Sequence, residues 1–126
     1  TQTISAAKDA IKLIEAYKAI TGSYPAGAYT YACIGEYPGD ICQYNAGSPE
    51  VSEQQIFKDE IATVGTMPQP STNQFDGGNG RLTGGAFYRK VQQNLTYNLA
   101  GSGQACSAGG GGDSPNSGVT ICTYSF

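Results

Sequence analysis

The sequence lacks histidine and tryptophan altogether, and it has few charged residues. Without histidine the chain cannot build a Ser-His or Cys-His nucleophile system. Its seven Lys and Arg residues are scattered, and the net charge is −3. General nucleic-acid binding, which needs clustered basic side chains, is therefore disfavoured. The chain also contains no run of roughly 20 apolar residues of the kind that crosses a membrane.

Acidic residues offer the only remaining catalytic chemistry. A carboxylate pair could come from Glu50, Glu53, Asp59 and Glu60. These residues fall together in a predicted helix region. Acidic side chains near the start of a helix stabilise it by interacting with its dipole, which favours a structural role. We therefore expect no catalytic residue, no cofactor and no enzyme activity.

Two short motifs give weak indications of function. The stretch 76–80, Asp-Gly-Gly-Asn-Gly, is similar to part of a calcium loop. It lacks the further acidic ligands and the bidentate Glu, so a turn is favoured over a weak calcium site, and no metal site is predicted. Asn94-Leu95-Thr96 is a glycosylation sequon that begins a predicted strand, and we expect it to stay unmodified.

The four cysteines are Cys33, Cys42, Cys106 and Cys122. Their spacing fits zinc-binding patterns poorly, which favours two disulfides and an oxidising compartment. Three pairings are open. The sequential one, Cys33–Cys42 with Cys106–Cys122, closes two short loops and matches the division of the chain into halves.

The length of 126 residues suits a single domain over 1–126. Apolar residues at helical spacing predict a helix over Thr3–Ile20, ended by Gly22 and Pro25. Its predicted apolar face, with Ile4 and Ile11 at the border, holds the following residues: Ala7, Ala10, Leu13, Ile14, Tyr17 and Ile20. A second helix is predicted over Ser52–Val64, with Ser52 and Gln55 as a capping box and an apolar stripe of Ile56, Phe57, Ile61 and Val64.

The second half of the chain changes to the alternating pattern of β-strands. Strands are predicted over Ala86–Gln92, Leu95–Leu99 and Val119–Tyr124, as an antiparallel sheet with one covered face. Glycine-rich stretches at 77–80 and 109–112 are predicted to be flexible connections. The fold class is therefore α+β, with a long N-terminal helix packed on a small antiparallel sheet.

The segment 6–25 carries a family resemblance. Its Ile14-Glu15-Ala16-Tyr17-Lys18, leading into Thr21-Gly22-Ser23-Tyr24-Pro25, is similar to the end of the first helix in type IV pilins, type II secretion pseudopilins and competence pilins. The resemblance in sequence covers about the first quarter of the chain. The expected architecture extends it over most of the rest.

The resemblance implies a stapled loop over residues 23–51 between helix and sheet, and a D-loop closed by Cys106 and Cys122. It also implies a hydrophobic N-terminal half-helix and a leader upstream of Thr1, since the chain begins without Met and inside helical periodicity. Such a half-helix would anchor the subunit in the inner membrane before assembly and then lie in the filament core.

The resulting functional expectation is a structural subunit of an extracellular or periplasmic filament, either a type IV pilus or a pseudopilus. It would work by helix-mediated assembly and surface display, with copies of itself or related subunits as partners. The alternative is a secreted binding module or adhesin that uses the Tyr-rich loop 24–44 to contact a surface ligand. The candidate surface-contact residues are Tyr29, Tyr31, Tyr37 and Tyr44. Tyrosines in such a loop can also pack as a half-buried lid over a helix, and packing or subunit contact is favoured over ligand recognition.

Overall fold

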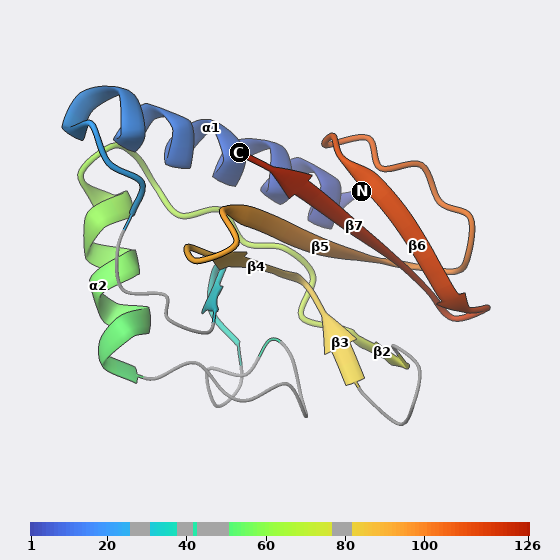
Figure 1. Ribbon diagram of the computed structural model, residues 1–126. Helices are drawn as coiled ribbons and strands as arrows, with labels where there is room; N and C mark the ends of the chain where they lie inside the picture. The colour runs from blue at the N-terminus through green and yellow to red at the C-terminus, as the bar shows by residue number, and fades with distance from the viewer. Residues whose placement is uncertain (26–30, 38–41, 43–50, 77–81) are drawn as a thin grey trace.

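A computed structural model describes residues 1–25, 31–37, 42, 51–76 and 82–126. It has the predicted α+β class (Figure 1). The two helices are α1 (Gln2–Thr21) and α2 (Val51–Ala62). The main sheet is antiparallel with the order β1 (Ala32–Cys33), β4 (Ala86–Arg89), β5 (Asn94–Ala100), β7 (Val119–Ser125) and β6 (Gly111–Asn116). A separate two-stranded sheet pairs β2 (Gln74–Asp76) with β3 (Leu82–Gly84).

Helix α1 ends at the glycine that its sequence predicts. The Thr1 side chain accepts a hydrogen bond from the backbone N–H of Ile4, and Gly22 closes the helix with a φ of +81°. The buried stripe is rotated from the predicted one toward Ile11, which is 6% exposed. Ile20, predicted to be buried, is 73% exposed because it lies about 110° around the helix from the centre of that stripe.

The core on the helix side of the sheet joins α1 and α2 to the central strands. We call this set the helix-side core, and its members are Ala7, Ala10, Ile11, Ile14, Ala32, Ile34, Phe57, Ile61, Ala86, Tyr88, Leu95, Tyr97, Leu99 and Cys122. Strands β4 and β5 contribute every second residue to it, as the alternation of side chains in a strand requires.

The prediction that only one face of the sheet is covered is wrong. A second group, which we call the tyrosine cluster, consists of Tyr31, Cys33, Tyr37, Cys42 and Phe87. Cys33 and Phe87 alternate along their strands with members of the helix-side core, so this cluster lies on the opposite face. The Cys33–Cys42 disulfide attaches Cys42 to β1 within this cluster.

Strand β6 replaces part of the connection predicted at 109–112. Gly111 pairs with Thr123 and Gly112 with Cys122, so the glycines add an edge strand to β7. A Cβ on Gly112 would lie 2.8 Å from the Cys106 sulfur. The close approach of the disulfide therefore explains a glycine inside this strand.

Helix α2 begins one residue earlier than predicted and ends at Ala62. The capping box is wrong, because Ser52 lies within the helix and the Gln55 side chain donates instead to Asp59 Oδ1, at 2.8 Å. Phe57 and Ile61 are buried as predicted, whereas Ile56 is 46% exposed and lies outside the stripe.

The buried side chain of Gln54 closes the outer edge of β1. Its Nε2 donates to the Cys33 carbonyl at 2.9 Å, and its Oε1 accepts from the Cys33 N–H at 2.7 Å. The amide of a helix residue thus makes the two bonds that another strand would make.

Gln54→Ala should therefore lower the free energy of unfolding by about 1–3 kcal/mol, because both backbone groups of Cys33 lose these bonds inside the protein. Urea unfolding followed by circular dichroism measures the change. Gln55→Ala is the matched control, since Gln55 is exposed on the same helix, and its change should stay within about 0.5 kcal/mol. Equal costs for the two variants would contradict the role given to Gln54.

Candidate functional site

The predicted tyrosine contact surface is wrong for two of its members. Tyr31 is 1% exposed and Tyr37 is 8% exposed, so neither offers its ring to a partner. The Tyr31 ring packs 5.3 Å from the Phe87 ring, and the Tyr37 hydroxyl accepts a hydrogen bond from the Ala86 N–H. Tyrosine rings fill the space over the second face of the sheet because they are large and can satisfy their hydroxyls there. Tyr29 and Tyr44 lie outside the described residues.

Burial raises the pKa of Tyr31 and of Tyr37 to about 12. A phenol in the unfolded chain ionises near pH 10. Between these values the unfolded chain releases protons that the folded protein keeps, so ionisation favours unfolding. The contribution of these tyrosines to stability is therefore complete below pH 10 and is lost as the pH rises toward 12.

We expect the free energy of unfolding to fall steadily between pH 10 and 12. Urea titrations at fixed pH values measure it, and tyrosinate absorbance at 295 nm reports ionisation in parallel. Tyr37→Phe removes one titrating group, so its stability should fall less steeply over the same window. A stability that stays constant from pH 10 to 12 would contradict the burial of these phenols.

Both predicted disulfides are confirmed. Cys33 pairs with Cys42 and Cys106 with Cys122, with Cα–Cα distances of 5.8 and 5.7 Å. The second bond joins the loop 101–110 to the buried Cys122 of β7, next to β5 in the sheet. The C-terminal loop is thus held against the same central strands that α1 covers.

Two of the acidic residues considered for catalysis are hydrogen-bonded to neighbouring side chains. Glu60 accepts a hydrogen bond from the Tyr17 hydroxyl of α1, and Asp59 accepts one from Gln55. Glu50 and residues 77–80 of the calcium-like stretch lie outside the described residues, as does the side chain of Glu53. Within the described part of the chain, no group of three His, Cys, Asp or Glu residues could hold a metal ion.

An aromatic cluster that the sequence did not predict surrounds Phe126. The Phe126 ring lies 5.8 Å from Tyr24, 6.0 Å from Tyr88 and 5.1 Å from Tyr124. The Lys18 ammonium group lies 5.3 Å from the centre of the Tyr24 ring. The contact between Tyr24 and Phe126 joins the segment after α1 to the end of β7, although the two residues are more than 100 positions apart in the sequence.

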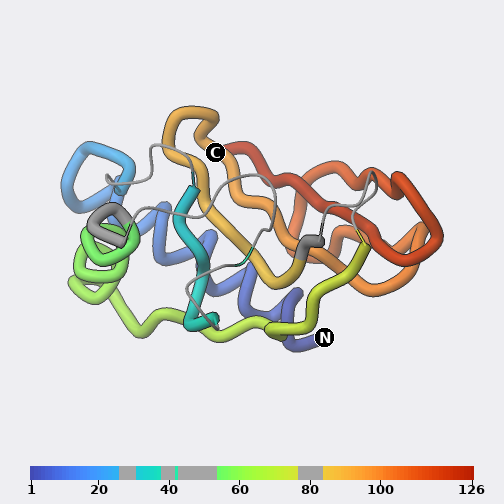
Figure 2. The backbone as a smooth tube through the Cα atoms, turned by 90° about the horizontal axis from the view of Figure 1, so that it is seen from below, coloured from blue at the N-terminus to red at the C-terminus, as the bar shows by residue number. Residues whose placement is uncertain are grey.

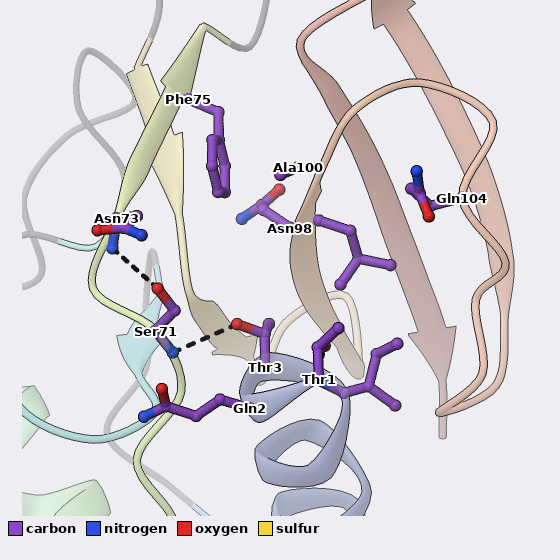
Figure 3. Close-up of a pocket in the computed structure, with 11 residues that line it drawn as sticks. Thr1, Gln2, Thr3, Ser71, Asn73, Phe75, Asn98, Ala100 and Gln104 are labelled. Carbon is purple, nitrogen blue, oxygen red and sulfur yellow. Dashed lines mark hydrogen bonds between the residues drawn. The ribbon is translucent and has the colours of Figure 1, made fainter.

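A hollow of about 260 Å³ lies beside the start of α1. Figure 2 shows residues 63–75 running from α2 to the first turn of α1. Between these residues, that first turn and the end of β5, the hollow is lined by Thr1, Gln2, Thr3, Ile4, Ser71, Asn73, Phe75, Asn98, Leu99, Ala100 and Gln104 (Figure 3). The sequence offered no signal for it, because four separate segments build it.

The hollow is held in shape by hydrogen bonds between its walls. Gln2 Nε2 donates to the Gln69 carbonyl at 3.0 Å, and the Ser71 N–H donates to Thr3 Oγ1 at 3.3 Å. The Asn73 N–H donates to Ser71 Oγ at 3.2 Å. The first turn of α1 is therefore attached to the segment that follows α2.

Neither helix in the described part of the chain is long and apolar enough to cross a membrane. No protein-family model matches the sequence, and no curated protein or solved structure is significantly similar to it.

Proposed function

We propose that this chain is a structural subunit of an extracellular or periplasmic filament of the type IV pilus or pseudopilus kind. The supporting observation is that α1 and the disulfide-closed C-terminal loop are both attached to the central strands. Ala10 and Ile14 of α1 join the helix-side core with residues of β5. The Cys106–Cys122 bond ties the loop to β7, the neighbour of β5. This is the arrangement that the pilin resemblance implies.

In the proposed mechanism, α1 continues an apolar helix that bundles with those of other subunits. The first turn of α1 suits such a role because it is bonded to the rest of the domain through Thr3 and Gln2. A force on the start of the helix would pass directly into the body of the domain. The sheet and the two disulfide-closed loops would then form the outer layer and contact the surroundings.

The alternative, an adhesin that uses the Tyr-rich loop 24–44, is less well supported. Two of its four candidate residues, Tyr31 and Tyr37, are buried under the sheet. The proposal for a filament does not use these rings as contacts, so their burial leaves it unaffected.

The coding sequence upstream of Thr1 tests the proposal. We expect a short leader with a prepilin-type cleavage site, followed by about 20 apolar residues with a Glu near their start. An ordinary secretory signal peptide cleaved directly before Thr1 would contradict a filament subunit and would favour the secreted binding module.

A further inference from the structure

The hollow beside α1 contains a buried polar atom without a partner. Asn98 is 1% exposed, and its Nδ2 donates to the carbonyls of Gly84 and Gly85 at 3.3 and 3.4 Å. Because carbonyls only accept, these bonds fix the orientation of the amide. Its Oδ1 then has no hydrogen-bond partner among the described residues. A buried acceptor without a donor costs about 1–3 kcal/mol, so the site favours a ligand that carries a donor.

Figure 3 shows the Asn98 side chain between the Phe75 ring and Ala100, with its amide nitrogen on the side of Phe75. The Asn98 oxygen is itself covered, and Phe75 is half-buried. A ligand hydroxyl can reach the oxygen only if the side chains that cover it move, and the half-buried Phe75 ring can pack against the face of the ligand.

The remaining described walls supply polar side chains without charge. The hydroxyl oxygens of Thr3 and Ser71 already accept backbone N–H bonds, which leaves their O–H hydrogens free to donate to a ligand. Asn73 and Gln104 add side-chain amides at the rim, and Ile4 and Leu99 add apolar surface. Among the residues that the structure describes, no Asp, Glu, Lys or Arg side chain lines the hollow.

The ligand that fits this wall is neutral and carries several hydroxyl groups on a ring. Each hydroxyl both donates and accepts, which serves Asn98 Oδ1 and the Thr3 and Ser71 hydroxyls together. A fully deprotonated anion could not donate to Asn98, and a cation would find no carboxylate among the described lining residues. The volume of about 260 Å³ is just below the range of roughly 300–1,000 Å³ that holds drug-sized ligands, so it suits a single ring.

We propose that the hollow beside the first turn of α1 binds one neutral sugar residue, with a hydroxyl on Asn98 Oδ1 and the sugar face on Phe75. The assignment rests on side chains and makes no use of the backbone N–H groups of the first helical turn. It is independent of the filament proposal, and each can fail while the other stands.

The test is a ¹H–¹⁵N NMR titration of the 126-residue chain with methyl glycosides of glucose, galactose, mannose and N-acetylglucosamine. Binding in the millimolar range is expected for at least one of them, with saturable shifts at the Asn98 side-chain amide and at residues 71–75 and 98–100. Phe75→Ala should weaken that binding about 10-fold or more. Gln92→Ala is the matched control, because it is exposed in the turn after β4 and should bind as the unchanged chain does.

Asn98→Asp removes the donor that orients this amide and places a negative charge in the hollow, so it should also weaken binding. If this variant does not fold, the Phe75→Ala result decides. No saturable shift with any of the four glycosides would overturn the proposal and leave ordered water as the partner of Asn98. Larger shifts of the same residues with inorganic phosphate or acetate would overturn the neutral ligand class.

Discussion

Gly85→Ala is expected to destabilise the protein by about 3–5 kcal/mol, which could leave it unfolded at room temperature. Gly85 has a φ of +57°, a conformation that alanine adopts at a cost. A Cβ at this position would lie 1.7 Å from the Tyr37 hydroxyl oxygen and 2.5 Å from its Cζ. Tyr37 cannot move away freely, because it is buried beside the Cys33–Cys42 disulfide and bonded to the Ala86 N–H.

Gly103→Ala is the control that separates conformational strain from the clash. Gly103 has a similar φ of +68°, but a Cβ there meets no atom within 4 Å. Its alanine variant should lose only about 1–2 kcal/mol, the cost of a left-handed conformation. Urea unfolding of both variants measures the difference. Similar losses would show that Tyr37 does not press on Gly85 in the way described.

Removal of the Cys106–Cys122 disulfide is the second large effect. The bond closes a loop with a sequence separation of 16, for which the chain-entropy relation gives about 3 kcal/mol. Cys122 is also fully buried in the helix-side core, so Cys106→Ala/Cys122→Ala loses packing as well. We expect the melting temperature to fall by about 10 °C or more in calorimetry.

The same variant should release strand β6 before the rest of the sheet. Gly112 packs against the Cys106 sulfur, and in the described structure β6 pairs only with β7. Hydrogen exchange at the amides of 111–113 should therefore speed up more than exchange in β5. The matched control is Cys33→Ala/Cys42→Ala, which should leave exchange in β6 close to its original rate. Unchanged protection of β6 after loss of Cys106–Cys122 would contradict this coupling.

The parts of the fold that the sequence predicted are those with strong local signals. Helix α1 has helical periodicity and a glycine at its end. Strand β5 alternates Leu95, Tyr97 and Leu99 with polar residues, and β7 is rich in β-branched residues. Both disulfides followed from four cysteines at short spacings within each half of the chain. Each of these signals lies within a single segment.

The features that the sequence did not predict depend on contacts between distant segments. Glycine is depleted in strands, and the sequence around Gly111 and Gly112 therefore did not predict β6. These glycines form a strand because they pair with β7, and the Cys106 sulfur lies too close to Gly112 for a side chain. Tyr31 and Tyr37 look like exposed loop residues until the second face of the sheet is in place to receive them. The hollow around Asn98 likewise needs α1, residues 71–75 and β5 together.

The central proposal, a filament subunit, is tested most directly by chemical cross-linking in intact source cells. After cell fractionation, an antibody raised against the 126-residue domain would detect the chain, and cells lacking the gene would be the control. A filament subunit should give a ladder of cross-linked multimers in the membrane or sheared-filament fraction. Recovery of the chain solely as a monomer in the soluble fraction or the medium would contradict the proposal.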